Sequence, residues 1–357
     1  MKKCLELARL GLKKTKTNPL VGCIITNNQT IISTGYHQKF GEPHAEVNAI
    51  KNLIKEHPIN YKKILKNATL YVNLEPCSHY GKTPPCVDLI IKYQIKHVII
   101  GTLDPFHKVN GTGIEKLQKH GKVTTGVLEK ECKQINRQYF TNHHLQRPFI
   151  ILKWAESKDG FINNNTKGIL KISCDESVTK THQWRSEVDG IMTGTNTIIC
   201  DNPRLTTRKV KGKNPTRITI DRKNQLLNGN WNILDKNAQT IIFQEKYNKL
   251  KGNIKYINYL TNKTKYNSND YEKIKEIMHI LYKEGIYTLL VEGGTTIIEN
   301  LINQNLWDEA RVFSSKTIIS KGVKSPNILT KNKSIEKRSG EDILTIIYNN
   351  PMQEQSF

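Results

Sequence analysis

The 357-residue sequence lacks long apolar runs, and this absence bears on where the protein works. No stretch approaches the roughly 20 consecutive apolar residues that a membrane-spanning helix needs. The opening segment, MKKCLELARLGLKK, carries charges throughout and has no apolar core of the length found in a signal peptide. We therefore expect a cytoplasmic protein that does not contact a membrane.

The cysteines lack the even number and regular spacing of a disulfide framework. Seven cysteines are scattered along the chain, and two of them belong to the metal motif described below. This usage is typical of proteins from a reducing compartment.

The basic residues lack any concentration into a patch, although the formal net charge is +23. Lysine and asparagine recur in every region, with no run of arginines and no basic stripe interleaved with aromatic residues. A sequence-wide bias of this kind produces a solvated basic surface, which favours an anionic substrate without forming a nucleic-acid footprint. An RNA-binding or nucleic-acid-editing protein is kept as the alternative.

Residues suited to bind a metal are present in the first half. The segment 43–46 reads PHAE, and Cys77 and Cys86 follow downstream. Zinc takes imidazole and thiolate ligands tetrahedrally, and a catalytic zinc keeps its fourth position for water. His44, Cys77 and Cys86 supply three ligands, while Glu46 is placed to carry protons. This division of roles is typical of zinc-dependent deaminases that act on nucleobase-like rings; the alternative is a buried histidine with two unrelated core cysteines.

The distance between the two cysteines narrows this interpretation. Eight residues separate Cys77 from Cys86, whereas editing deaminases usually carry P-C-x-x-C. The run LEPCSHYGKTPPC at 74–86 resembles the deaminase half of the bifunctional riboflavin-biosynthesis deaminase/reductase family, as do NPLVGC at 18–23 and GEPHAEV at 41–47. The match is dense from residue 18 to about 113 and is looser but colinear beyond.

The resemblance implies roles for individual residues of the first half. Glu46 is the expected catalytic residue, and one Zn²⁺ per chain is expected on His44, Cys77 and Cys86. The positions expected to bind the deaminase substrate are Asn18, His37, His79 and Lys82. The chain departs from the family at 106–107, where Phe-His stands in place of the usual Asn-Pro.

The hydrophobic pattern predicts an α/β protein of two domains, 1–145 and 146–357. In the first domain we expect helices at 5–12, 43–56, 86–93 and 129–140, strands at 21–25, 30–32, 68–74 and 98–100, and a polar linker at 141–148. In the second we expect strands at 149–154, 188–195, 218–221, 240–243 and 288–292, and a helix that follows Gly293-Gly294 and runs through Leu301.

The second half lacks a G-x-G-x-x-G Rossmann fingerprint, and its Gly-Gly turn is by itself a weak sign of a phosphate site. However, GTNT at 194–197, DNPRLT at 201–206 and VEGG at 291–294 resemble the reductase half of the same family. The resemblance implies a cytidine-deaminase-like α/β/α domain followed by a dihydrofolate-reductase-like α/β domain, and NADPH as the second cofactor.

The reductase half also has residues that match family positions. Those expected to bind the cofactor are Ala155, Lys171, Thr197, Asp201, Gly294, Thr295 and Thr296, and those expected to bind the reductase substrate are Ile169, Arg185, Leu205, Arg208 and Glu292. Two positions depart from the family: Lys158 replaces a leucine, and Lys171 stands where the family has a tryptophan.

The activity implied by the resemblance has two steps. A diaminopyrimidinone ribosyl phosphate is deaminated to the aminouracil, and the ribosyl group is then reduced to ribityl with NADPH. The expected partner is this small phosphorylated pyrimidine, with no nucleic acid and no membrane; a homo-oligomer is compatible with the sequence. A monofunctional deaminase with a degenerate reductase domain is the alternative within the family.

Overall fold

The computed structural model describes residues 1–12, 14–15, 17–80, 84–106, 109–165, 170–227, 229–260, 270–328 and 334–349. The chain divides into two compact units, Met1–Leu145 and Gln146–Phe357. None of the helices in these described ranges has the length and apolar character that crossing a membrane requires.

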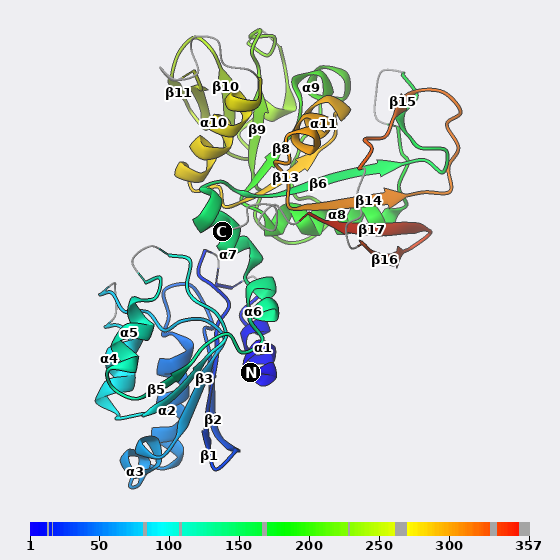
Figure 1. The fold of residues 1–357 in the computed structure, drawn as a ribbon. Coiled ribbons are helices and arrows are strands. Elements are labelled where there is room, and N and C mark those ends of the chain that lie inside the picture. The colour runs from blue at the N-terminus through cyan, green and yellow to red at the C-terminus, as the bar shows by residue number, and fades with distance from the viewer. Residues whose placement is uncertain are drawn as a thin grey trace. The chain divides into compact units, whose positions relative to one another are not determined.

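The first unit is an α/β sandwich (Figure 1). Its helices are α1 (Lys2–Arg9), α2 (Ala45–Glu56), α3 (Tyr61–Lys66), α4 (Cys86–Lys92), α5 (Thr112–Gln118), α6 (Glu129–Ile135) and α7 (Arg137–Leu145). Its strands are β1 (Gly22–Asn27), β2 (Thr30–Tyr36), β3 (Thr69–Val72), β4 (His97–Ile100) and β5 (Lys122–Thr124).

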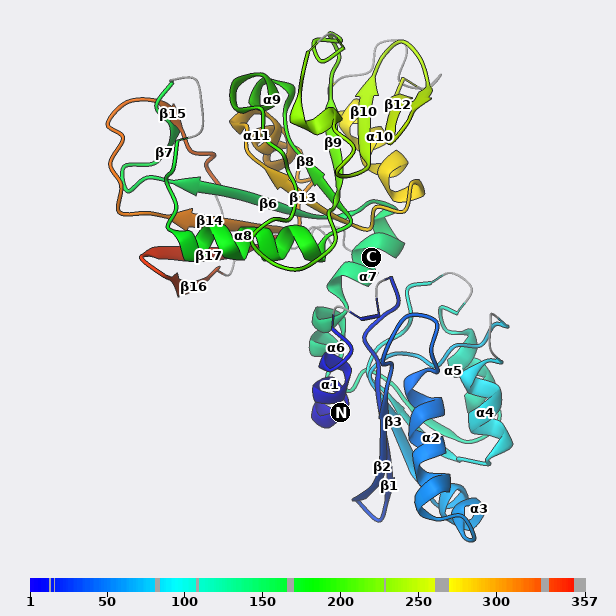
Figure 2. The ribbon, with the colours of Figure 1, turned by 180° about the vertical axis from the view of Figure 1, so that it is seen from behind.

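The sheet of this unit has the order β2-β1-β3-β4-β5 in the described residues. β1 is antiparallel to β2 and β3, whereas β3, β4 and β5 are parallel. Figures 1 and 2 show α1 and α6 on one face of the sheet and α2 on the other. Glycines permit both approaches: a Cβ on Gly22 would lie 2.1 Å from the Cys4 carbonyl oxygen of α1, and one on Gly35 would lie 2.3 Å from the Ala49 nitrogen of α2.

The apolar faces of α2 and α4 form the core that supports the predicted metal site. Ala49, Ile50 and Leu53 of α2 pack with Val87 and Ile90 of α4, and each is at most 1% exposed. The strands contribute β-branched and leucine side chains to the same cluster. Because this core fixes both helices against the sheet, it also fixes the residues at their N-terminal ends.

The second unit is built on a larger mixed sheet. Its helices are α8 (Asp175–Glu187), α9 (Thr195–Asp201), the 3₁₀ helix η1 (Asn232–Leu234), α10 (Asp270–Lys283) and α11 (Thr295–Asn303). Its strands are β6 (Phe149–Glu156), β7 (Phe161–Asn163), β8 (Gly190–Met192), β9 (Thr216–Ile220), β10 (Thr240–Gln244), β11 (Lys249–Lys251), β12 (Ile254–Asn258), β13 (Thr288–Glu292), β14 (Glu309–Ser314), β15 (Val323–Lys324), β16 (Ser334–Ser339) and β17 (Asp342–Tyr348).

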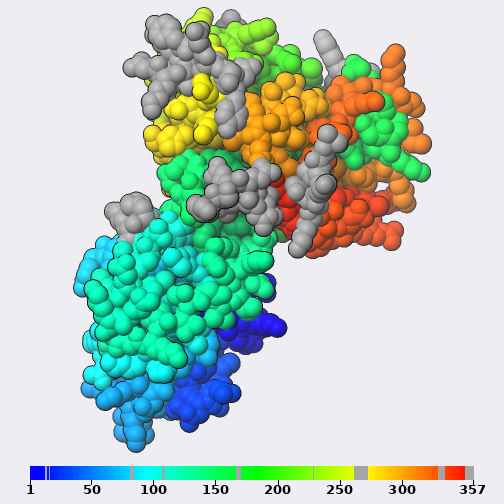
Figure 3. Space-filling model, in the orientation of Figure 1, coloured from blue at the N-terminus to red at the C-terminus, as the bar shows by residue number. Residues whose placement is uncertain are grey.

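In the described residues the main sheet has the order β11-β12-β10-β9-β8-β13-β6-β14-β17-β16. The strands from β12 to β14 are parallel, and antiparallel strands close both edges. One face packs against α10 and α11, and the other against Trp184 of α8. The edge strand β16 is mostly exposed and belongs to the C-terminal part of the chain, which is coloured red in the space-filling view (Figure 3). Both units are therefore α/β, as the sequence predicted.

Three local predictions are wrong. The first helix ends at Arg9 rather than at Leu12, because the chain turns at Gly11, where a Cβ would lie 2.6 Å from the His37 carbonyl oxygen. The strand expected at 188–195 is confined to β8, since α9 begins at Thr195.

The third wrong prediction is the polar linker at 141–148. Its first half is the C-terminal part of α7, in which Thr141 and Asn142 are buried. The ring of His143 packs 4.4 Å from that of Tyr139, and the ring of His144 packs 5.9 Å from that of Phe140. Polar residues were mistaken for solvated ones because their partners come from the same helix and from distant segments.

Candidate functional site

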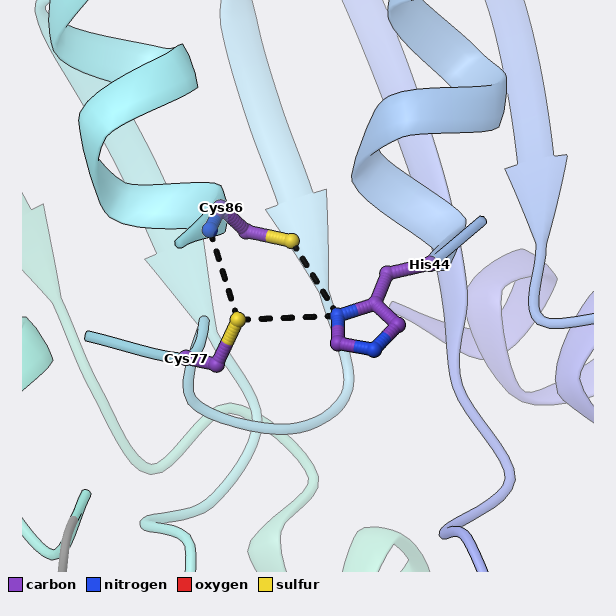
Figure 4. Close-up of side chains that lie close together, drawn as sticks. All are labelled: His44, Cys77 and Cys86. Atoms are coloured by element: carbon purple, nitrogen blue, oxygen red, sulfur yellow. Dashed lines mark hydrogen bonds between the residues drawn. The ribbon is translucent and has the colours of Figure 1, made fainter. Parts of the chain in front are cut away.

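Three side chains predicted to hold metal converge in the first unit (Figure 4). His44 is the N-cap of α2, Cys86 is the first residue of α4, and Cys77 lies in the segment that follows β3. His44 Nδ1 lies 3.5 Å from Cys77 Sγ and 3.3 Å from Cys86 Sγ. The backbone N–H of Cys86 also donates to Cys77 Sγ at 3.3 Å. The positive ends of two helix dipoles therefore meet at a pair of thiols.

The spacing of these atoms fits a zinc ion. Tetrahedral coordination with Zn–N and Zn–S bonds of ordinary length separates the nitrogen from each sulfur by about 3.5 Å. The three ligand atoms lie within 4.8 Å of one another, and in the described part of the chain they form the group suited to hold a metal. The pKa of Cys77 is lowered to about 4, chiefly by a hydrogen bond from Cys86 and also by one from His44. The thiolate that binds metal is thus the favoured form.

Glu46 lies in the first turn of α2, two residues beyond His44, and is 3% exposed. Burial raises the pKa of its carboxyl to about 7. Its Oε2 atom is buried and has no hydrogen-bond partner among the described residues. A carboxyl group that exchanges a proton near neutrality and has a free oxygen is suited to general acid–base work.

His37 and Asn18 form a pair beside the metal group. His37 Nδ1 lies 3.2 Å from the Pro43 carbonyl oxygen, which can only accept, so this nitrogen carries the proton. Its Nε2 atom then accepts from the amide of Asn18 at 3.0 Å. Burial lowers the pKa of His37, in agreement with this neutral form. The pairing directs the amide oxygen of Asn18 away from His37, and the His37 ring packs edge-on, 5.5 Å from that of His44.

The remaining predicted residues of the first site are only partly described. His79 follows Cys77 by two residues, and its Nδ1 atom is buried with no hydrogen-bond partner among the described residues. Lys82 lies outside the residues that the structure describes. His79 thus has an unsatisfied polar atom that is available to a ligand, two residues along the chain from the metal ligand Cys77.

The second unit contains a cavity of about 740 Å³. Its walls come from β6, α8, α9, the segment after α9, and the turn between β13 and α11. The predicted residues that line it are Ala155, Lys171, Arg185, Thr197, Asp201, Leu205, Arg208, Glu292, Gly294 and Thr295. Thr296 points to the exposed side of α11 and does not line the cavity, and Ile169 lies outside the described residues. A cavity of this size accommodates a cofactor-sized ligand.

Arg185 and Glu292 form a bidentate ion pair in the cavity wall. The Nε and Nη2 atoms of Arg185 donate to the two carboxylate oxygens of Glu292, each at 2.7 Å, and Nη1 donates to the Thr206 carbonyl at 3.2 Å. The arginine side chain is 12% exposed and the glutamate 9%. Arg185 therefore uses three of the five N–H donors of a guanidinium within the protein. Arg208 donates through Nη1 to the carbonyl oxygen of Thr206 at 3.3 Å and to its hydroxyl at 3.0 Å.

The Gly-Gly turn and two unsatisfied oxygens form a further part of the cavity wall. Gly293 and Gly294 adopt φ values of 74° and 76°, and a Cβ on Gly294 would lie 3.0 Å from Thr197 Oγ1. The buried Oγ1 of Thr193 and Oδ1 of Asp201 have no hydrogen-bond partner among the described residues. A Cβ on Gly293 would lie 3.8 Å from Thr193 Oγ1, so the turn that leads into α11 lies near this oxygen. The combination fits a phosphate-bearing cofactor with hydroxyl donors, as NADPH is.

Lys153 and His182 are among the cavity residues that the sequence reasoning missed. Lys153 is the one cationic residue of β6, and burial lowers its pKa while Glu292 opposes the shift. His182 is 4% exposed, and its Nδ1 atom accepts the backbone N–H of Arg208 at 3.1 Å. Burial, followed by Arg185 and Arg208, lowers the pKa of His182 to about 4. A lysine within an apolar strand was a usable signal, whereas nothing in the sequence marked His182.

Comparison with known proteins matches each half of the chain to a family. Residues 1–102 match the cytidine and deoxycytidylate deaminase zinc-binding region, and residues 148–331 match the RibD C-terminal domain. The riboflavin biosynthesis protein RibD of Aquifex aeolicus is 36% identical over 329 residues, which cover 90% of this chain and 88% of that protein. The RibD protein of Buchnera aphidicola is 35% identical over 89% of this chain and 87% of its own length.

Solved structures give the same result for the fold. A diaminohydroxyphosphoribosylaminopyrimidine deaminase/5-amino-6-(5-phosphoribosylamino)uracil reductase from Thermotoga maritima superposes with a TM-score of 0.80 at 34% identity, covering 98% of this chain and 97% of the other. One structure of Acinetobacter baumannii RibD gives a TM-score of 0.76 at 25% identity, with the same coverage.

Proposed function

The chain belongs to the bifunctional deaminase/reductase family of riboflavin biosynthesis, and from this premise we propose which unit performs each reaction and with which residues. Residues 1–145 carry the zinc-dependent deaminase, which converts 2,5-diamino-6-(5-phosphoribosylamino)pyrimidin-4-one to 5-amino-6-(5-phosphoribosylamino)uracil. Residues 146–357 carry the NADPH-dependent reductase, which converts the ribosyl group to ribityl. The observation that supports the first assignment most directly is the His44, Cys77 and Cys86 group with Glu46 buried beside it.

In the deaminase, Glu46 moves the protons. Zinc held by His44, Cys77 and Cys86 would supply the Lewis acidity that lowers the pKa of a water molecule from 15.7 to about 7. Glu46 then accepts one proton of the attacking water and delivers it to the ring nitrogen, and it carries the second proton of that water to the leaving amine. Its raised pKa, about 7, suits both directions of transfer. Asn18, oriented by His37, offers its amide oxygen to an amino or N–H group of the pyrimidine.

In the reductase, the cavity residues orient the two ligands. NADPH would supply the hydride that reduces the ribosyl carbon. Thr197, Asp201 and the Gly294 turn hold the cofactor, while Arg208 binds the substrate phosphate and Glu292, held by Arg185, accepts from ribosyl hydroxyls. Arg208 suits this task because its guanidinium is permanently charged. The positive charge of Lys153 and Arg208 makes the cavity attractive to phosphorylated ligands.

The enzyme acts on a small molecule, and we propose that it does so in the cytoplasm, without nucleic acid and as a homo-oligomer. The scattered distribution of basic residues supports the exclusion of nucleic acid. An RNA affinity that falls steeply with salt would contradict this part of the proposal. Size measurement in solution tests the assembly.

The experiment that tests the proposed function is a coupled assay with the purified protein. The diaminopyrimidinone ribosyl phosphate is supplied with and without NADPH, and the product mass is followed. Without NADPH we expect the change from an amino group to an oxygen, and with NADPH the further gain of two hydrogens. The first change alone would support the monofunctional alternative, and neither change would contradict both assignments.

A further inference from the structure

Glu75 is a buried carboxylate to which the deaminase chemistry assigns no role. It is 3% exposed, and each of its two oxygens accepts hydrogen bonds from two backbone N–H groups. Oε2 accepts from Asp104 at 3.2 Å and Gly111 at 2.9 Å, and Oε1 accepts from Gly113 at 3.0 Å and Ile114 at 3.2 Å. A buried carboxylate is costly unless its charge is compensated, and these donors all come from one segment of the chain. Glu75 therefore fastens Asp104 and residues 111–114 to the segment that carries the metal ligand Cys77.

Other contacts join the same two segments. A Cβ on Gly113 would lie 2.5 Å from the Pro76 carbonyl oxygen, so the segments approach as closely as a glycine permits. The hydroxyl groups of Ser78 and Thr112 lie 2.5 Å apart, and Lys116 Nζ donates to the Ser78 carbonyl at 3.1 Å. The carboxylate of Glu75 is the anionic member of this contact, and it accepts the backbone N–H of Asp104.

Asp104 links Glu75 to the aromatic residue Phe106. Its Oδ1 atom accepts the backbone N–H of Phe106 at 2.8 Å and the hydroxyl of Tyr139 at 2.9 Å. The ring of Phe106 lies 5.5 Å from that of His79 and 5.3 Å from that of His143. His79 is the residue near the metal group whose buried Nδ1 atom has no hydrogen-bond partner among the described residues. Phe106 therefore packs against His79, whose buried Nδ1 atom is available to a ligand.

We propose that Glu75 is a positioning residue of the deaminase: by holding Asp104 it places Phe106 against His79, and Phe106 forms a wall of the substrate pocket. The inference rests on the proposed deaminase function of this unit. It predicts that loss of the carboxylate weakens substrate binding more than it slows the chemistry, because Glu46 and two of the metal ligands, His44 and Cys86, lie at the starts of α2 and α4 and not on the segment that Glu75 fastens. A carboxylate that only stabilised the fold would not produce this split between KM and kcat.

The test compares Glu75→Gln, Phe106→Ala and the double variant. The control is Glu56→Gln, which makes the same chemical change at an exposed residue, the last of α2. Glutamine keeps one acceptor oxygen and turns an NH₂ group toward two N–H donors. We expect the deaminase KM to rise on the order of tenfold in both single variants, as the loss of charge-assisted hydrogen bonds implies. Turnover, zinc content and reductase activity should stay close to the wild type.

The double variant decides whether the two residues act together. We expect its KM to be no higher than the larger of the two single-variant KM values, since both changes remove the same wall. Additive effects, or loss of zinc with an unchanged KM, would overturn the inference. If Glu75→Gln is insoluble, Glu75→Asp replaces it: a raised KM in Glu75→Asp and Phe106→Ala supports the proposal, and an unchanged KM in either contradicts it. Wild-type protein without deaminase activity would instead contradict the proposed function.

Discussion

The two units build their sites in opposite ways. In the first unit, three ligands and a proton carrier come from two short motifs, and the N-terminal ends of α2 and α4 bring them together. In the second unit, the cavity draws residues from positions 153 to 323, and a single ion pair, Arg185 to Glu292, joins positions 107 residues apart. A metal demands fixed distances from a few atoms, whereas a cofactor cavity spreads its contacts over many residues.

This difference predicts how each site responds to substitution. The metal group has no redundancy, because each ligand supplies a third of the protein coordination. The cavity distributes binding over hydrogen bonds, charge and apolar contact, so that single changes should reduce its activity without abolishing it. The two activities of one chain also serve as internal controls for each other.

The largest effect is expected for Cys86→Ser. Serine does not supply the soft thiolate that zinc prefers in this donor set, so the variant should lose both bound zinc and deaminase activity while its reductase activity persists. Elemental analysis and the two separate assays measure these outcomes. Cys132→Ser, at another buried thiol of the same unit outside the metal group, should keep its zinc. Full zinc occupancy in Cys86→Ser would mean that the third ligand is misassigned.

The next effect is expected for Glu46→Gln. The amide fills the same space but cannot exchange a proton, so kcat for deamination should fall by about 10²–10⁴. Zinc should remain, because Glu46 is not one of the three grouped ligands. The measurement is single-substrate kinetics beside elemental analysis. Wild-type turnover in this variant would remove Glu46 from the mechanism and weaken the comparison between the sites.

The sequence predicted the metal group well because its chemistry is written in short motifs. His44, Cys77 and Cys86 were identified from residue type and spacing, and the strand and helix that present them followed from the period of the apolar residues. The α/β class was predictable for the same reason. The strands β3, β6, β10 and β13 are apolar runs bounded by turn residues.

The rest of the molecule was not predictable from local pattern. The antiparallel strand β17 is held by pairing with β14, and β16 by pairing with β17, and neither strand is marked by alternation in the sequence. The C-terminal part of α7, from Thr141 to Leu145, was mistaken for a linker, because burial of Thr141 and Asn142 depends on distant segments. In the cavity, His182 is set by the backbone of Arg208, which lies 26 positions later. Such residues acquire their roles from tertiary structure, so that the family resemblance pointed to this site more strongly than any local pattern did.

A smaller effect, confined to the second unit, is expected for Arg185→Lys. Lysine keeps the charge but not the planar fork that holds both oxygens of Glu292. Glu292 should become mobile, and kcat/KM for reduction should fall by about tenfold, which corresponds to roughly 1.4 kcal/mol. Arg338→Lys on the exposed strand β16 is the control. A loss as complete as that of Cys86→Ser would show that the cavity also depends on one residue, contrary to the comparison.

The smallest effect is expected for Lys171→Trp, which restores the residue type that the family resemblance implies. The Lys171 side chain lines the cavity but is 68% exposed, and its ion pair with Asp175 spans 3.3 Å. An exposed pair of this kind contributes little, and the indole adds an apolar face against which a cofactor ring can pack. We expect NADPH to bind only a few-fold more tightly by fluorescence titration, in line with an aromatic contact of about 1 kcal/mol. The matched control is Lys209→Trp, since Lys209 pairs with the same Asp175 at 3.3 Å but does not line the cavity. A gain of a hundredfold or more would instead show that the native cavity binds NADPH poorly, and that Lys171 marks a reductase unit whose cofactor site has degenerated.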